Sequence, residues 1–153
     1  MAEQNKRHNT TITNRKARHE YTILQTFEAG LVLQGTEVKS IRQGKASITE
    51  AYCKLEGGEV WIHGMHVTPY EQGNRYNADP LRPRKLLLHA SEIEAIRKQL
   101  DEKGLTLIPL KIFFFRGFVK LEVGVARGKK LYDKRESIAA RDVERDRRRE
   151  ESE

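Results

Sequence analysis

The chain has 153 residues, which is room for one domain and its extensions but not for two domains. Its single cysteine excludes an internal disulfide, and no apolar run is long enough to span a membrane, so we expect a cytoplasmic protein with no membrane partner. The net charge of +7 favours a polyanionic partner.

The positive surplus lies mostly at the two ends of the chain. Residues 1–19 hold five Lys or Arg against one acid, and residues 127–153 hold ten against eight. Residues 20–126 hold fourteen against thirteen, so the body is nearly neutral. A neutral body with basic ends is typical of a nucleic-acid-binding domain that carries charged extensions.

Ordered structure is expected to begin near Asn14, because residues 1–13 are polar and offer little apolar surface to bury. Apolar and polar residues then alternate over residues 21–27, which predicts a strand. We expect Ala29-Gly30 to break or bulge this strand.

The next elements are a short helix and a hairpin. Residues 36–44 predict the helix, with Thr36 as its N-cap and a closing glycine. Residues 51–55 and 60–63 are two β-prone runs joined through a central Gly-Gly pair. Glycine adopts the positive φ angles of a tight turn, so these runs predict a hairpin.

Residues 67–83 contain three of the four prolines and predict a long loop, which is usually functional or disordered. A Ser-x-x-Glu capping box at Ser91 predicts a helix with Ile93, Ile96 and Leu100 facing inward. Two strong strand patterns follow at 105–115 and 119–125. Many short strands and few helices predict a mainly β fold, an antiparallel barrel with two or three short flanking helices.

The segment after residue 127 has two open interpretations. It is so rich in charge that it can be a solvated extension without a partner. Alternatively, the capping-box spacing from Asp133 to Glu136 can start a helix, on which basic groups recur on one side at Lys134, Arg141, Arg145 and Arg148. Such a polar helix would form only against a charged surface.

The cluster Arg82-Pro83-Arg84-Lys85 also has two interpretations. It can be ordinary surface charge, or it can be the basic loop that flanks an oligonucleotide site on a barrel. Spacing alone does not separate the two.

The aromatic residues and the histidines suggest functional sites, but each has a simpler structural explanation. Phe113, Phe114 and Phe115 suggest base stacking, but strand alternation exposes at most one face of the three, so we expect most of their ring area in the core, as for Tyr52 and Trp61. His63 and His66 lack the further ligands of a metal site. The sequence contains no phosphate loop and no nucleophile elbow, so we expect no enzyme, no cofactor and no metal.

The chain resembles the SmpB family of SsrA-binding proteins, which work with transfer-messenger RNA in bacterial ribosome rescue. Six segments carry the resemblance in the family's order, at residues 14–21, 27–31, 35–40, 84–89, 126–130 and 133–135. The resemblance implies an OB-like closed barrel that binds the tRNA-like domain of transfer-messenger RNA. The expected RNA-binding residues are Arg15, Lys16, Glu28, Arg82, Arg84, Lys85, Leu87 and His89.

The resemblance also implies a role for the tail. It would become helical in the empty messenger channel of a stalled ribosome, with Tyr132 stacking on a base of the decoding centre. The expected tail residues are Gly128, Lys129, Lys130, Tyr132, Asp133, Lys134 and Arg135.

The expected organisation is a flexible N-terminus at 1–13, an OB-like RNA-binding barrel at 14–126 and a disordered basic tail at 127–153. The protein would be a non-enzymatic adaptor, monomeric when free, with transfer-messenger RNA and the ribosome as partners. The alternative is a structural ribosomal protein whose tail is threaded into ribosomal RNA.

Overall fold

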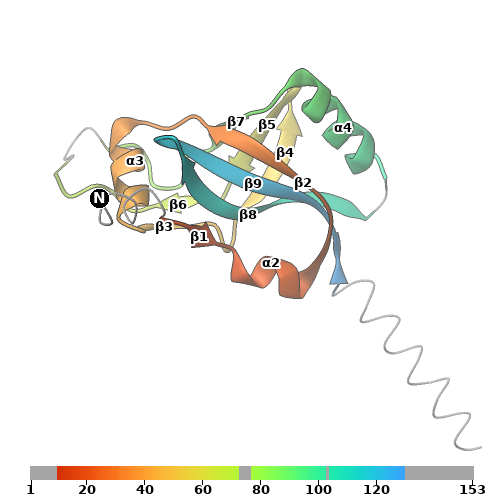
Figure 1. The fold of residues 1–153 in the computed structure, drawn as a ribbon, viewed down its shortest axis with the longest axis horizontal. Helices are drawn as coiled ribbons and strands as arrows, with labels where there is room; N and C mark the ends of the chain where they lie inside the picture. The colour runs from red at the N-terminus through yellow and green to blue at the C-terminus, as the bar shows by residue number, and fades with distance from the viewer. Residues whose placement is uncertain (1–9, 73–76, 103, 130–153) are drawn as a thin grey trace, which may run out of the picture.

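The computed structural model describes residues 10–72, 77–102 and 104–129, which form a closed β-barrel with helices around it (Figure 1). The elements in chain order are β1 (Ile12–Thr13), α2 (Arg15–Glu20), β2 (Tyr21–Leu31), α3 (Gly35–Arg42), β3 (Ala46–Ser47), β4 (Tyr52–Glu56), β5 (Glu59–His63), β6 (His66–Val67), β7 (Arg84–Leu87), α4 (Ala90–Leu100), β8 (Leu105–Phe115) and β9 (Phe118–Gly128). The predicted mainly β class is confirmed.

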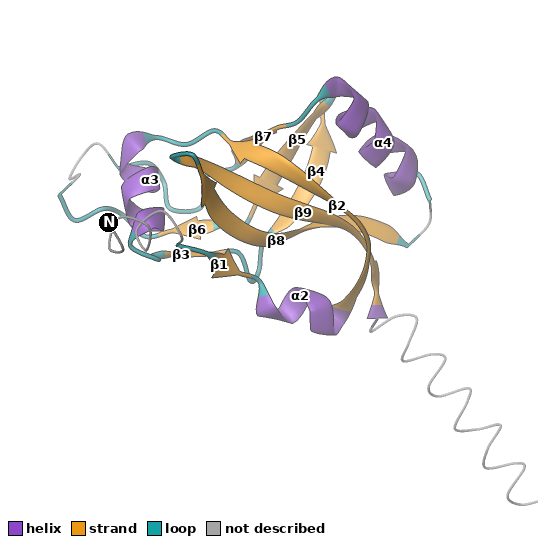
Figure 2. Ribbon diagram, in the orientation of Figure 1, coloured by secondary structure: helices purple, strands orange, loops and turns teal. Residues whose placement is uncertain are grey.

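The barrel is one antiparallel sheet that closes on itself. Its strand order is β1-β8-β4-β5-β7-β2-β9, and the additional pairing of β8 with β9 joins the two sides. A closed sheet leaves few unpaired strand edges, so the described part is an OB-like barrel rather than an open sheet. Three helices flank it, as Figure 2 shows.

The predicted β4–β5 hairpin is present, the two later strand patterns form a second hairpin, and positive φ angles make both turns possible. Gly57 and Gly58 join β4 to β5 with φ of 59° and 78°. Arg116 and Gly117 join β8 to β9 with φ of 51° and 81°. Two consecutive positive φ angles match the twist of the strands on either side.

Strand alternation places the core as expected. Val119, Leu121, Val123 and Val125 are all buried inside the barrel. The predicted break at Ala29-Gly30 is wrong, because β2 continues through it with Gly30 paired to Leu87 on one side and Lys120 on the other. The register shift of β2 lies between Ile23 and Gln25 instead.

The helices α3 and α4 lie on opposite sides of the barrel (Figure 1) and contribute Ile41 and Ile96 to its core. Their predicted N-caps are each wrong by two residues. The N-cap of α3 is Gln34 rather than Thr36, and that of α4 is His89 rather than Ser91. In each case the glutamate three residues on, Glu37 or Glu92, accepts the N-cap backbone N–H, and this reciprocal bond fixes the helix start.

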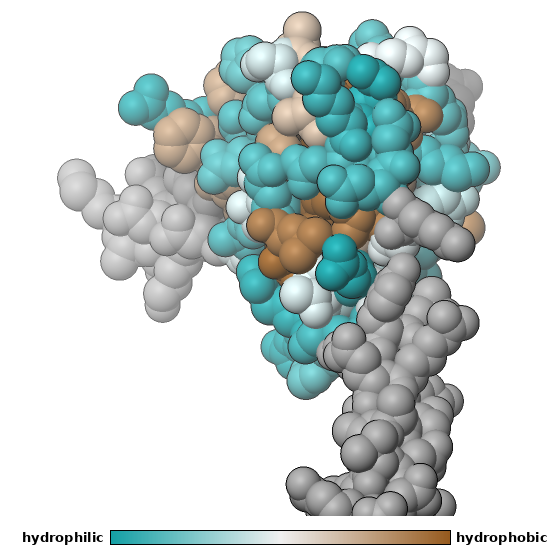
Figure 3. Space-filling view, turned by 90° about the vertical axis from the view of Figure 1, so that its right-hand side faces the viewer, coloured by the Kyte–Doolittle hydropathy of each residue, from teal (hydrophilic) through white to brown (hydrophobic). Residues whose placement is uncertain are grey.

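A helix at α2 was not predicted, because Ala17 is its single buried residue. Ala17 packs on the outside of the barrel, against Ile108, Leu110 and Ala126. Asn14 holds the start of α2 with hydrogen bonds from its Nδ2 to the carbonyls of Pro109 (3.0 Å) and Ile48 (3.4 Å). The side of the molecule drawn in Figure 3 is largely hydrophilic around one apolar patch. No helix in the described residues is long and apolar enough to cross a membrane.

Candidate nucleic-acid interface

The outward side of β7, β2, β9 and β8 forms one continuous surface, which we call the outer face. Residues that lie opposite one another in antiparallel strands point to the same side. Leu87, Gly30, Lys120 and Phe113 are cross-strand partners in one row, and Glu28, Glu122 and Lys111 form the next row. Both rows point away from the core residues Val119 and Leu121.

The structure brings two of the predicted RNA-binding residues together on the outer face. Glu28 and Leu87 are both exposed, and 54% of Leu87 is accessible, which is high for a leucine. Leu87 lies over Gly30, where a Cβ atom would be 3.4 Å from the leucine Cβ. His89 is exposed just beyond, at the start of α4. These exposed residues form one surface, on which the His89 side chain also accepts the backbone N–H of Glu92, and their contact with RNA remains a prediction.

The helix α2 extends the outer face with basic side chains. A cavity of about 200 Å³ is lined by Arg15 and Arg18 of α2 together with Lys111 and Glu122. Lys111 and Glu122 form an ion pair at 3.3 Å. Basic groups therefore outnumber acidic groups where α2 meets β8 and β9, which is the charge balance that phosphates require.

The sequence did not predict three basic residues on this surface: Arg18, Lys111 and Lys120. For Lys120 the signal was present, because the inward pattern of Val119 and Leu121 places Lys120 outward. For Lys111 it was not, because the register of β8 shifts between Pro109 and Lys111. Bulges of this kind invert the inward and outward sides of a strand.

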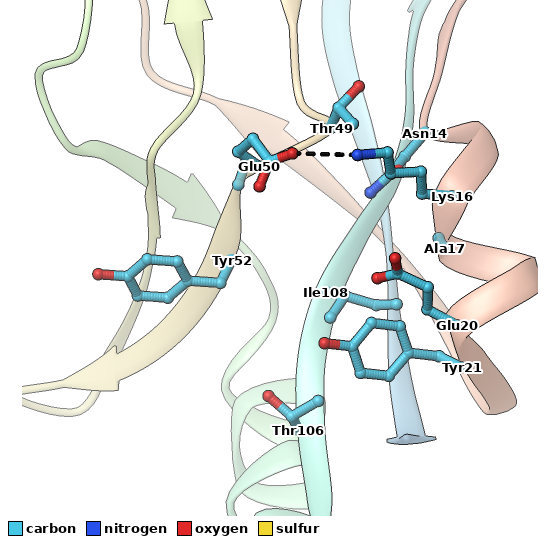
Figure 4. A pocket seen from close by; sticks show the side chains of 11 residues that line it. Asn14, Lys16, Ala17, Glu20, Tyr21, Thr49, Glu50, Tyr52, Thr106 and Ile108 are labelled. Atoms are coloured by element: carbon cyan, nitrogen blue, oxygen red, sulfur yellow. Dashed lines mark hydrogen bonds and ion pairs between the residues drawn. The ribbon is translucent and has the colours of Figure 1, made fainter. Parts of the chain in front are cut away.

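Lys16 does not lie on the outer face. Its Nζ pairs with Glu50 at 3.3 Å in a separate pocket of about 230 Å³, between α2 and β4 (Figure 4). The rings of Tyr21 and Tyr52 and the carboxylate of Glu20 also line this pocket. The carboxylates of Glu20 and Glu50 outnumber the Lys16 ammonium, so this pocket is a poor phosphate site. Lys16 therefore lies apart from Arg15, which lines the cavity on the outer face.

The structure contradicts the prediction that Arg84 contacts RNA. Arg84 is 0% exposed, because alternation along β7 turns it inward with Leu86. Its guanidinium donates to the buried Glu37 carboxylate at 2.6 Å and to the Met65 carbonyl at 2.7 Å. Arg84 therefore stabilises the barrel and is not accessible to an RNA.

The neighbours of Arg84 are also engaged within the fold. Arg82 donates to the same Glu37 carboxylate, and Lys85 pairs with Glu59 at 2.5 Å. Burial alone would raise the pKa of Glu37, but hydrogen bonds from the two arginines and the N-cap backbone outweigh it and hold that pKa below its usual range. The side chains of Arg82, Arg84 and Lys85 therefore form ion pairs within the fold.

The expectation that the aromatic residues are core is wrong for Phe115 and Tyr52. Phe115 is 52% exposed, and Tyr52 is exposed and stacked on His63 with ring centroids 5.4 Å apart. Phe118, for which no burial was predicted, is 71% exposed. His63 also contacts the Glu56 carboxylate at 3.0 Å. No group of three metal-ligating side chains occurs within the described residues.

The start of the predicted tail belongs to the barrel. Gly128 ends β9 and pairs with Tyr21, two residues beyond the predicted boundary. The Lys129 Nζ donates to the Arg18 carbonyl at 3.2 Å. The other predicted tail residues lie outside the described part of the chain: Lys130, Tyr132, Asp133, Lys134 and Arg135.

The family model "SmpB protein" matches residues 11–153. An SsrA-binding protein of Acetivibrio thermocellus is 58% identical over 95% of this chain and 94% of its own length. An SsrA-binding protein of Desulforudis audaxviator is also 58% identical, over 90% of each chain.

A solved chain of similar fold comes from the structure "tmRNA-SmpB: a journey to the center of the bacterial ribosome". It is 49% identical with a TM-score of 0.69, over 82% of this chain and 88% of that one. The barrel, the family model and the similarity over nearly the whole length agree. This chain belongs to the SmpB family of SsrA-binding proteins.

Proposed function

We propose that this protein is an RNA-binding adaptor that holds the tRNA-like domain of transfer-messenger RNA and delivers it to stalled ribosomes. The observation that carries the proposal is the outer face, a continuous exposed surface with basic groups from α2 at its border. Its sequence relatives are SsrA-binding proteins, and a chain of similar fold comes from a solved tmRNA-SmpB structure.

The chemistry of the outer face suits a folded RNA better than a bare phosphate chain. Arg15, Arg18 and Lys120 supply phosphate contacts, which give affinity without sequence preference. Glu28 accepts hydrogen bonds from a base or a ribose hydroxyl, and His89 offers a ring for stacking or hydrogen bonding. Leu87 gives an apolar contact. A surface that mixes basic, acidic and apolar groups selects an RNA by its folded shape rather than by its charge alone.

The chain would divide its work between two segments. The part from β1 to the end of β9 would form the RNA-holding body, which begins two residues before the predicted boundary because Ile12 and Thr13 pair with β8. The tail from Lys130 onward would enter the empty messenger channel, with Tyr132 on a base of the decoding centre. Messenger in the channel would compete with the tail, which restricts delivery to ribosomes without a codon.

We further propose that the protein acts without catalysis, as a monomer in the cytoplasm. The family is a family of RNA-binding proteins, and adaptor function needs binding surfaces only.

Reconstituted translation of a messenger without a stop codon tests the proposal. Transfer-messenger RNA charged with alanine is added with and without this protein, and tagged peptide is measured. We expect tagging only when the protein is present. Equal tagging without it would contradict an adaptor role.

A further inference from the structure

The tip of the β8–β9 hairpin exposes two phenylalanine rings side by side. Phe118 is 71% exposed, the highest value among the large apolar side chains in the described residues, and Phe115 is 52% exposed. The two are direct cross-strand partners, so their rings project from the same side of the hairpin. Paired exposed rings are unfavourable in water and indicate a binding surface.

These rings contribute little to the core. Phe114, which lies between Phe113 and Phe115 on β8, turns inward and packs against the core cluster. Neither Phe115 nor its cross-strand partner Phe118 belongs to a buried hydrophobic cluster. The stability of the barrel therefore gives no reason for aromatic side chains at 115 and 118.

Basic groups lie beside the phenylalanine rings of the hairpin. The Arg116 guanidinium carbon lies 5.2 Å from the Phe115 ring centroid, and the Lys111 Nζ lies 5.5 Å from that of Phe113. Lys120 is the cross-strand partner of Phe113. Aromatic rings interleaved with arginine and lysine form the typical surface for unpaired nucleotides, since bases stack on the rings while cations hold the phosphates.

The hairpin tip continues the outer face. Lys120 belongs to the same row as Gly30 and Leu87, and Phe118 lies on the same side of β9, about 7 Å further along the strand. An RNA that contacts Leu87 and Lys120 reaches the hairpin tip within one or two nucleotides. The cationic groups beside the rings make a second copy of this chain a poor occupant, because like charges would meet.

Resting on the proposed function, we propose that Phe115 and Phe118 form a stacking platform for unpaired bases of the RNA held on the outer face. Arg116 and Lys120 neutralise the phosphates that flank these bases. The platform would favour an RNA with exposed loop bases over a continuous duplex, whose bases are already stacked.

Substitution of Phe118→Leu tests the platform, because leucine keeps an apolar side chain but cannot stack. Phe118→Trp is the matched control. The full-length wild type and both variants are titrated with the isolated tRNA-like domain and with a blunt RNA duplex of the same length. We expect the leucine variant to bind the tRNA-like domain about five- to a hundredfold more weakly, with duplex binding and salt dependence unchanged. The tryptophan variant should bind as the wild type does.

Three results would overturn the platform. The leucine variant could bind the tRNA-like domain as tightly as the wild type, or could lose duplex binding to the same degree. The wild type could form a dimer in sedimentation that the leucine variant does not form. Failure of the wild type itself to prefer the tRNA-like domain over ordinary tRNA would instead contradict the proposed function, so the two failures are distinguishable.

Discussion

Glu37 is the residue on which the end of the barrel beneath α3 depends. It is 3% exposed and accepts hydrogen bonds from Arg84, which is fully buried, and from Arg82. Glu37→Gln would leave Arg84 without its counter-charge, so we expect a loss of about 3–5 kcal/mol in the free energy of unfolding. Urea denaturation measures this loss. Glu94→Gln breaks an exposed ion pair with Arg97 and serves as the control, with a much smaller loss because solvent screens that pair.

The same carboxylate should make stability depend on pH. The pKa of Glu37 is lower in the folded protein than its usual value of 4.5. Its stabilisation is therefore complete above that value and is lost as the pH falls through the lower folded value. We expect the free energy of unfolding of the wild type to fall more steeply below pH 4.5 than that of Glu37→Gln. Parallel curves for the two proteins would contradict this role.

At the scale of the strand, Lys120 is the proposed phosphate contact on β9 that is simplest to test. Lys120→Gln should weaken binding of the tRNA-like domain and lower the slope of log affinity against log salt by about one. Lys54→Gln is the control, because Lys54 is an exposed lysine on β4 and lies opposite Trp61, outside the outer face. Equal effects of the two substitutions would mean that the outer face is not the binding surface.

Elements with a strong local signal were predictable from the sequence. Alternation identified β9, and the Gly57-Gly58 pair identified the β4–β5 hairpin. The capping box of α4 was misplaced because Ser91-x-x-Glu94 and His89-x-x-Glu92 overlap, and only tertiary packing chooses between them. The six residues of α2 carry no periodic apolar stripe, so no local pattern could show that helix.

The candidate site was predictable only in part. Glu28 and Leu87 lie together as the resemblance implied, although they are far apart in sequence. The burial of Arg84 was not predictable, because its partner Glu37 is 47 residues away and the pairing exists only once the barrel closes. The exposed rings of Phe115 and Phe118 were also missed, since a run of apolar residues reads as core unless the edge of the core is known.

At the scale of the whole molecule, body and tail should be separable. Truncation should begin at Lys130, because Gly128 at the end of β9 pairs with Tyr21 of β2 and Lys129 donates to the Arg18 carbonyl. We expect the truncated protein to bind the tRNA-like domain as the full chain does and to support no peptide tagging on stalled ribosomes. Filter binding and the reconstituted tagging reaction measure the two properties. Loss of RNA binding on truncation would refute this division of labour.

The most direct test of the adaptor function is competition between two RNAs for the full-length protein. The tRNA-like domain of transfer-messenger RNA is bound at near-physiological salt, and ordinary tRNA is added as the competitor. We predict a strong preference for the tRNA-like domain, because Glu28, Leu87 and the hairpin tip would contact bases and riboses of a folded RNA as well as its phosphates. Equal binding of both RNAs with a steep salt dependence would contradict that prediction and leave only a basic RNA-binding barrel.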